Sequence, residues 1–276
     1  MALLQKAYLG ATPLFRNTSF FEDNAYTVSD RSSAVTVTAN ASAHVKGAWT
    51  ELIASTSANA SAIYVEASFV SNGFDTSCLL DIGTGASGSE TALISNIAVG
   101  GSRSTASVGA YYFVIPIQVA SGTRISARIQ HITGSATGTT LVEARDYGDY
   151  AQSPTSVDTI GTDTATSTGT DFVTANTYVQ LTSSTSRAYR AIVMLPNVSG
   201  NAIASVLSTF TLATGASGAE TEIGVRRFDY GNAENTLMRE DPLVASNVPS
   251  GTRLAVKIQG PTSNIAMYGV CLIGIP

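Results

Sequence analysis

An acidic residue beside a glycine-rich turn is the feature of this sequence that most suggests chemistry. Asp81 is followed closely by Gly83 and Gly85, an arrangement that would suit acid hydrolysis if a second carboxyl group shared its proton. A similar segment recurs 130 residues later, with Thr211 at the position that corresponds to Asp81. Because the second carboxyl group is missing, we predict that Asp81 is not half of a catalytic pair.

The sequence does not fit other catalytic or metal-binding patterns, either in spacing or in residue type. Residues 85–88 (GASG) differ from a nucleophile elbow, whose second glycine comes one residue later, and they lack the lysine of a phosphate-binding loop. His44 and His131 are the only histidines, and neither has a second ligand at zinc spacing. Acidic residues such as Asp146 and Asp149 leave a structural calcium ion as a minor alternative. We predict a protein that is not an enzyme and has no cofactor, metal or catalytic residue.

The glycines are better explained by a tight turn between two strands. Glycine adopts positive φ without steric cost and lets other groups approach the backbone closely. Glu90 and Glu220 would then begin the returning strand, either exposed or accepting hydrogen bonds from the turn amides. A glycan or cation site at these two carboxylates is the alternative. The predicted turn positions are Gly83, Gly85, Gly88, Gly215 and Gly218.

These turns belong to an internal repeat. Residues 84–91 (TGASGSET) return as 214–221 (TGASGAET), and 121–125 (SGTRI) return as 250–254 (SGTRL), at offsets of 130 and 129 residues. A period of this length is that of a complete domain. We predict an N-terminal docking arm (1–29), a first β-sandwich (30–147), and a linker with a second β-sandwich (148–276).

Alternation of apolar and polar residues predicts the strands of both copies. In the segment 124–130, Ile125, Ala127 and Ile129 occupy every second position, and 253–259 repeats the pattern. Clusters of Gly, Ser, Asn and Pro separate such segments at intervals of about 10 residues, with no helical stripe between them. We predict an all-β protein with two tandem antiparallel sandwiches of the jelly-roll type.

Composition narrows the range of partners. The 276 residues have a net charge of −5 and no basic block that could neutralise a phosphate backbone. No apolar run approaches the roughly 20 residues of a membrane helix, and the first residues lack the apolar core of a signal peptide. Cys78 and Cys271 are too few for a disulfide framework. We predict neither a nucleic-acid partner nor a membrane partner.

Two segments carry more apolar residues than a lone sandwich needs. The arm is rich in large side chains without a counterpart in the second copy, which suggests that it docks on another surface. The last strand, 265–275, is apolar on both faces, so another subunit or the opposite domain should cover it. We predict a homo-oligomer, with a trimer as the first expectation. The candidate interface residues are Leu14, Phe15, Phe20, Phe21, Tyr268, Val270 and Leu272.

The chain resembles virion proteins of tailed bacteriophages. The resemblance lies in residues 80–90 (LDIGTGASGSE), the repeated Ser-Gly-Thr-Arg strand, the segment 7–10 (AYLG), and alternation rich in Ser, Thr and Ala. It implies β-sandwich modules that act through shape and assembly in the virion, which is assembled in the host cytoplasm. The implied function is that of a structural subunit, such as a head decoration, cement or spike protein, whose partners are other virion proteins. The alternative is a tail module that binds a host-surface glycan or receptor.

Overall fold

The computed structural model describes residues 8–9, 12–13, 27–70, 77–99, 110–148, 150–198, 206–230, 236–238, 243–260 and 268–276. Within these residues every regular element is a β-strand except the short 3₁₀ turn η2 (Tyr150–Gln152), and every strand pair is antiparallel. The prediction of an all-β protein with antiparallel sheets is confirmed.

The first half forms two packed sheets. Sheet 1A has the strand order β5-β10-β7-β8, and sheet 1B has the order β3-β11-β6-β9, with β4 also paired to β11. Their strands are β3 (Thr27–Arg31), β4 (Val35–Thr38), β5 (Thr50–Ile53), β6 (Ala60–Val70), β7 (Cys78–Thr84), β8 (Thr91–Val99), β9 (Ala110–Val119), β10 (Ile125–His131) and β11 (Thr137–Asp146).

The second half also forms two sheets. Sheet 2A has the order β15-β21-β17-β18-β19, and sheet 2B has the order β13-β14-β22-β16-β20, with β12 also paired to β22. Their strands are β12 (Asp158–Ile160), β13 (Thr162–Asp163), β14 (Thr168–Asp171), β15 (Tyr178–Thr182), β16 (Tyr189–Val198), β17 (Val206–Thr214), β18 (Thr221–Tyr230), β19 (Thr236–Met238), β20 (Leu243–Val248), β21 (Leu254–Gln259) and β22 (Tyr268–Ile275).

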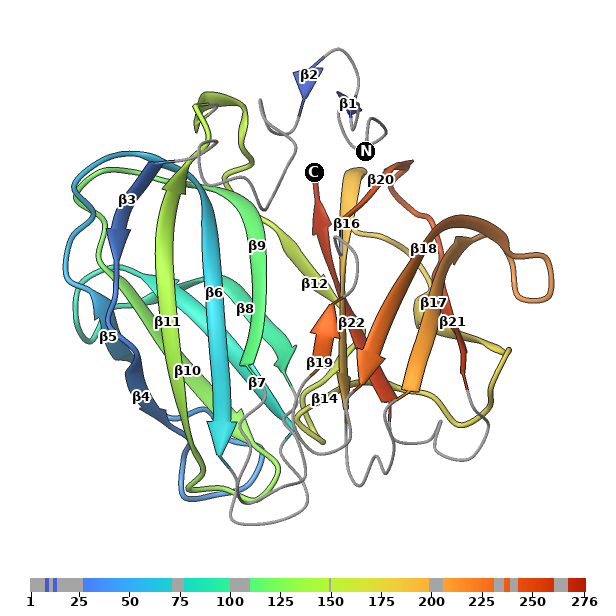
Figure 1. Cartoon of the computed structure of the whole chain (residues 1–276), viewed down its shortest axis with the longest axis horizontal. Coiled ribbons are helices and arrows are strands. Elements are labelled where there is room, and N and C mark those ends of the chain that lie inside the picture. The colour runs from blue at the N-terminus through green and yellow to red at the C-terminus, as the bar shows by residue number, and fades with distance from the viewer. Residues whose placement is uncertain are drawn as a thin grey trace.

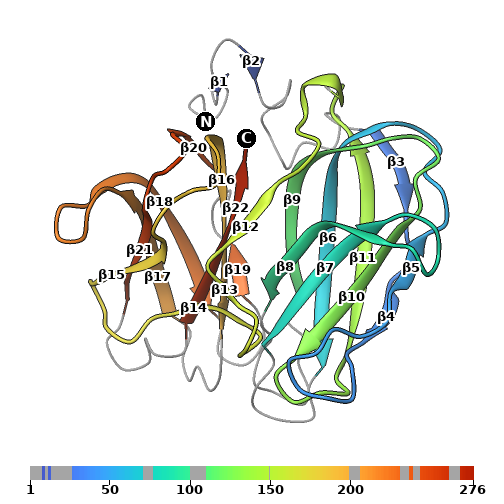
Figure 2. The ribbon, with the colours of Figure 1, turned by 180° about the vertical axis from the view of Figure 1, so that it is seen from behind.

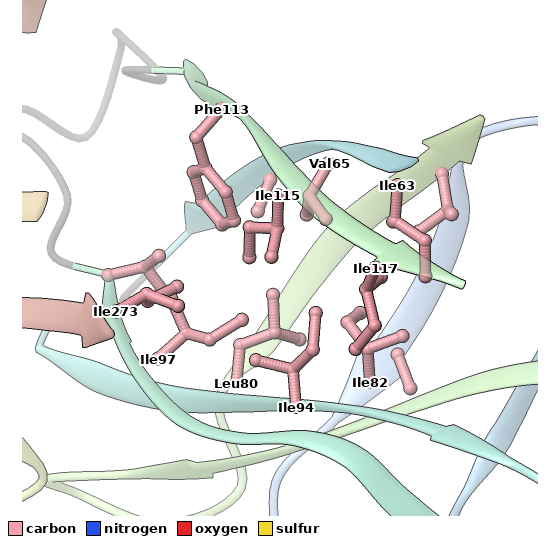
Figure 3. Packing of buried hydrophobic residues seen from close by; sticks show 14 of the residues in the cluster. Ile63, Val65, Leu80, Ile82, Ile94, Ile97, Phe113, Ile115, Ile117 and Ile273 are labelled. Atoms are coloured by element: carbon pink, nitrogen blue, oxygen red, sulfur yellow. The ribbon is translucent and has the colours of Figure 1, made fainter. Parts of the chain in front are cut away.

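Alternate residues of each strand fill the space between the sheets. In the first half, Ile63 and Val65 of β6 face Leu80 and Ile82 of β7 across a layer that excludes solvent (Figure 3). In the second half the aromatic ring of Phe210 packs edge-on against two other phenylalanine rings. Burial of these side chains, each worth about 2 kcal/mol, holds the sheets of each sandwich together.

The strand orders of the two halves correspond. The pairs β5/β15, β10/β21, β7/β17 and β8/β18 occupy the same order in sheets 1A and 2A, and β11, β6 and β9 correspond to β22, β16 and β20 in sheets 1B and 2B. The register corresponds as well, since Ala127 lies opposite Ile82 and Val256 lies opposite Leu212. This match is what a duplicated domain requires, and we retain duplication of one sandwich as a proposal.

Sheet 2B is the middle layer of the molecule, between the first sandwich and sheet 2A (Figure 1). Val270 and Leu272 of β22 point into the second core, whereas Ile273 and its neighbours on the other face join the first core. Strand β16 contacts β8 in the same way, with Val193 buried in the first core. The two sandwiches therefore share a continuous apolar layer.

This arrangement corrects the interface prediction for the last strand. Val270 and Leu272 are buried inside the chain, and the first sandwich covers the opposite face of β22. Both apolar faces are thus explained within one chain, so β22 no longer supports a homo-oligomer. The backbone of Tyr268 belongs to β22, opposite Val198, but its side chain lies outside the described part of the structure.

The arm begins with two short strands, β1 (Tyr8–Leu9) and β2 (Thr12–Pro13), which pair with each other. Strand β1 lies beside β20 of the second half, near the chain's N-terminus in Figures 1 and 2. The predicted docking residues Leu14, Phe15, Phe20 and Phe21 fall outside the described residues.

The segment predicted as a linker is short and attached to the first sandwich. Gln118 of β9 donates to the carbonyl oxygens of Pro154 and Ser153 through its main chain and its side chain. The second half then enters its own sheet at β12. Cys78 and Cys271 are buried free thiols, and burial raises the pKa of Cys271 to about 12. Among the described residues, no helix is long and apolar enough to cross a membrane.

Candidate functional site

The repeated turn is a hairpin that joins β7 to β8 in the first half and β17 to β18 in the second. Gly85 and Gly88 have φ of 115° and 82°, and Gly215 and Gly218 have φ of 102° and 83°. These values lie in the region that favours glycine. Gly83 serves a different purpose, because a Cβ atom there would lie 2.6 Å from the ring of Trp49.

An arginine and a glutamate hold the first hairpin. Glu90 accepts a hydrogen bond from the Gly88 amide at 2.9 Å, and Arg124 Nη1 donates to Glu90 Oε1 at 2.8 Å. The same guanidinium reaches the carbonyl oxygen of Gly85 and, through Nε, the carboxylate of Glu51 at 2.7 Å. Burial by itself raises the pKa of Glu90, but the hydrogen bonds from Arg124 and the turn amide outweigh it and lower the pKa below its usual value.

The second hairpin is held by the corresponding residues. Arg253 Nη1 donates to Glu220 Oε1 at 3.1 Å and to the Gly215 carbonyl oxygen at 2.9 Å, and Glu220 accepts from the Gly218 amide at 3.0 Å. Gln180 replaces the second carboxylate and accepts from Arg253 Nε at 2.8 Å. The Glu90 and Glu220 side chains are only 4% and 9% exposed. Because each carboxylate is turned toward its arginine and turn amide, the geometry favours the structural interpretation over a glycan or cation site.

The hairpin glycines carry the first testable prediction. Replacing Gly85 or Gly215 with valine should destabilise the protein by about 3 kcal/mol. The reason is that the new side chain meets both an unfavourable φ and a carbonyl oxygen, 2.9 Å from Cβ at Gly85 and 2.7 Å at Gly215.

Chemical denaturation of both variants checks the expected loss of stability. Gly88→Ala is the matched control, since it has positive φ but no atom within 4 Å of the new Cβ, and it should cost about 1 kcal/mol. Parent-like unfolding midpoints for both valine variants would contradict the role given to these turns.

Asp81 is the centre of a buried ion cluster in sheet 1A. Asp81 is 1% exposed. Its two carboxylate oxygens accept hydrogen bonds from Lys46 Nζ at 2.7 Å and from Arg128 Nε at 2.8 Å. The amide of Asn96, which has φ of 56° where the register of β7 and β8 shifts, also donates to it at 2.7 Å. Burial lowers the pKa of Lys46, and the attraction of Asp81 opposes this effect. Both oxygens of Asp81 are occupied by bonds that tie strands together.

In the second half, the basic residue at the corresponding position pairs with a different carboxylate. Thr211 lies at the position of Asp81, opposite Lys257, and Lys257 Nζ instead pairs with Glu222 at 2.9 Å. In both halves the cation also lies over an aromatic ring, with 4.4 Å between the Arg128 guanidinium carbon and the Trp49 ring and 4.7 Å between Lys257 and the Tyr178 ring. Each outer sheet face thus carries an aromatic–cation pair.

The two histidines lie in structural positions. His44 Nδ1 is 2.9 Å from the Ser167 hydroxyl of the second half, and His131 is buried, with Nδ1 accepting from the Thr133 amide at 3.0 Å. Gln130 donates to the same serine and to the Thr164 carbonyl oxygen. No group of three or more metal-ligating side chains occurs within the described ranges. His44 and Gln130 therefore attach the β13–β14 hairpin to the first sandwich.

A second charged cluster lies on sheet 1B, and the sequence did not predict it. Glu143 and Arg145 are both buried and bonded to each other at 2.8 Å, and Arg145 lies 4.1 Å over the Tyr64 ring. Their spacing of two residues along β11 places them on one face, which is the only sequence signal that could have revealed them.

Two comparisons with known proteins find no relative. A scan against models of known protein families finds no match, and no curated protein matches the sequence.

Proposed function

We propose that this chain is a non-enzymatic structural subunit of a phage particle, serving as a head decoration, cement or spike protein. The observation that carries the proposal is that acidic side chains of the repeated turns and of sheet 1A are bonded inside the chain. Asp81, Glu90 and Glu220 bind cations and amides of neighbouring strands and so stabilise the sheets. A protein that works through shape and assembly needs this type of internal support.

The shared apolar layer is a second support for the proposal. Sheet 2B packs on sheet 2A with one face and on the first sandwich with the other, which joins the two halves into one body. Such a body suits a component that contacts several neighbours in an assembled shell, and its proposed partners are other virion proteins.

Mass spectrometry of purified particles tests the proposed function directly. The chain should co-purify with particles at a fixed copy number relative to the major shell protein. Its absence from washed particles, in an infection that expresses it, would refute the proposal.

The N-terminal arm supplies a second test. Deleting residues 1–24 should leave the sandwiches folded but reduce incorporation into particles, because the arm concentrates large apolar side chains outside either sandwich. Circular dichroism checks the fold and quantitative blotting of particles checks incorporation. Normal incorporation of the truncated chain would show that the arm is not a docking segment.

A glycan-binding tail module is the second candidate function. The half-buried rings of Trp49 and Tyr178, each beside a cation on an outer sheet face, favour it. Aromatic rings stack on sugars, so this function predicts retention on host polysaccharide that Tyr178→Ala weakens. Co-purification without such retention would favour the structural subunit.

A further inference from the structure

The repeated sequence motifs meet at one end of each sandwich. In the first half, Arg124 joins the turn 121–124 to the hairpin 84–91. Thr56 joins the same turn to the loop 55–57, because its hydroxyl accepts from the Thr123 amide at 3.0 Å and its carbonyl oxygen accepts from the Gly122 amide at 2.7 Å. We call the segments 55–57, 84–91 and 121–124 the first end surface.

The second half has a matching set of bonds. The Thr185 hydroxyl accepts from the Thr252 amide at 3.1 Å, and the Thr185 carbonyl oxygen accepts from the Gly251 amide at 2.9 Å. Arg253 then joins this turn to the hairpin, as described above. The segments 184–186, 214–221 and 250–253 form the second end surface.

The exposed tips of these surfaces are more alike than the cores behind them. Ala86 and Ser87 are exposed at the first tip, and 216–217 at the second tip carries the same two residues, also exposed. One further exposed position differs, because Ser89 of the first tip corresponds to Ala219 of the second. At corresponding buried positions Leu80 is replaced by Phe210. Packing restricts buried residues, whereas most exposed substitutions change stability little. The positive φ values explain the glycines but not the recurrence of the exposed alanine and serine, which a contact outside the chain would explain.

The two tips point away from each other. The β7–β8 hairpin lies at one end of the long axis and the β17–β18 hairpin at the other, in both views (Figures 1 and 2). Because the apolar layer of sheet 2B joins the sandwiches, the distance between the tips is set by the fold. Two like surfaces held apart in this way cannot both contact one small partner.

We propose that the two end surfaces are equivalent binding sites through which one chain bridges two copies of the same shell protein. This inference rests on the proposed function as a virion subunit and adds the mode of attachment. The arginine and glutamate of each surface are paired internally, so the tips present serine hydroxyls and alanine methyl groups. The partner surface is accordingly a neutral, polar protein surface. Two-site attachment strengthens binding by about 100- to 10,000-fold over one site.

Binding of the full chain to particles assembled without it tests the bridge. Ser87→Arg and Ser217→Arg each place a long cation on one tip, and each should weaken binding by at least about 100-fold. The double variant should show no specific binding. Val173→Arg is the control, because it adds the same charge at an 81% exposed position outside both end surfaces, and it should bind like the parent.

The outcomes separate the two proposals. Equal losses in the single variants and a complete loss in the double variant, with parent-like melting temperatures, support two equivalent sites. If the parent chain binds and the double variant binds equally well, the end surfaces are not the contacts, while the virion function stands. A loss in only one single variant means one site and overturns the bridge. Failure of the parent chain to bind overturns both proposals.

Discussion

Replacing Asp81 with threonine, the residue at the corresponding position of the second half, should destabilise the first sandwich by about 3 kcal/mol. The substitution leaves Lys46 and Arg128 without their shared carboxylate, and their side chains are only 18% and 32% exposed. It also removes the acceptor of the Asn96 amide. The cost arises from uncompensated charge in a poorly hydrated place, because a lone buried ion is far less favourable than a paired one.

Urea denaturation followed by the fluorescence of Trp49, the only tryptophan of the chain, measures this loss in the first half. Thr211→Val is the matched control, since it alters the corresponding position where no ion cluster depends on the side chain, and it should cost less than about 1 kcal/mol. The double variant Asp81→Thr with Lys46→Met should recover part of the stability because it removes one orphaned charge. If Asp81→Thr costs no more than Thr211→Val, the ion cluster does not hold the sheet together.

Replacing Ile273 with aspartate should separate the unfolding of the two sandwiches. Ile273 is fully buried in the first core although it belongs to β22 of the second half (Figure 3). The variant loses the apolar contact and buries a carboxylate without a partner, at a cost of at least about 4 kcal/mol. The loss falls on the layer between the sandwiches, so each half should then unfold by itself.

Two probes together test this uncoupling. In the parent chain, Trp49 fluorescence and far-ultraviolet circular dichroism should follow one transition, and in Ile273→Asp they should give different midpoints. Val256→Ala, inside the second core, is the control: it lowers stability without changing a residue of the first core. Coincident transitions in Ile273→Asp would show that the layer does not couple the halves.

The alternation of residues by itself determined the strands and their inner faces. Ile125, Ala127 and Ile129 are buried as the pattern requires, because successive side chains of a strand point to opposite faces. The glycines at 85 and 88 were also readable, since a hairpin of this kind needs positive φ at residues without a Cβ. Local rules thus decided which segments are strands and where the repeated turns lie.

Only the tertiary structure decided what these elements contact. Asp81 takes its partners from Lys46 and Arg128, 35 and 47 residues away in sequence, and strand order and register bring them together. The sequence indicated that both faces of β22 are covered, either by the opposite domain or by another subunit, and we predicted a homo-oligomer from it. An apolar face indicates that a strand is buried, but it does not indicate which surface buries it, because the hydrophobic effect is not directional. In the structure the first sandwich packs on sheet 2B and so covers the second face of β22.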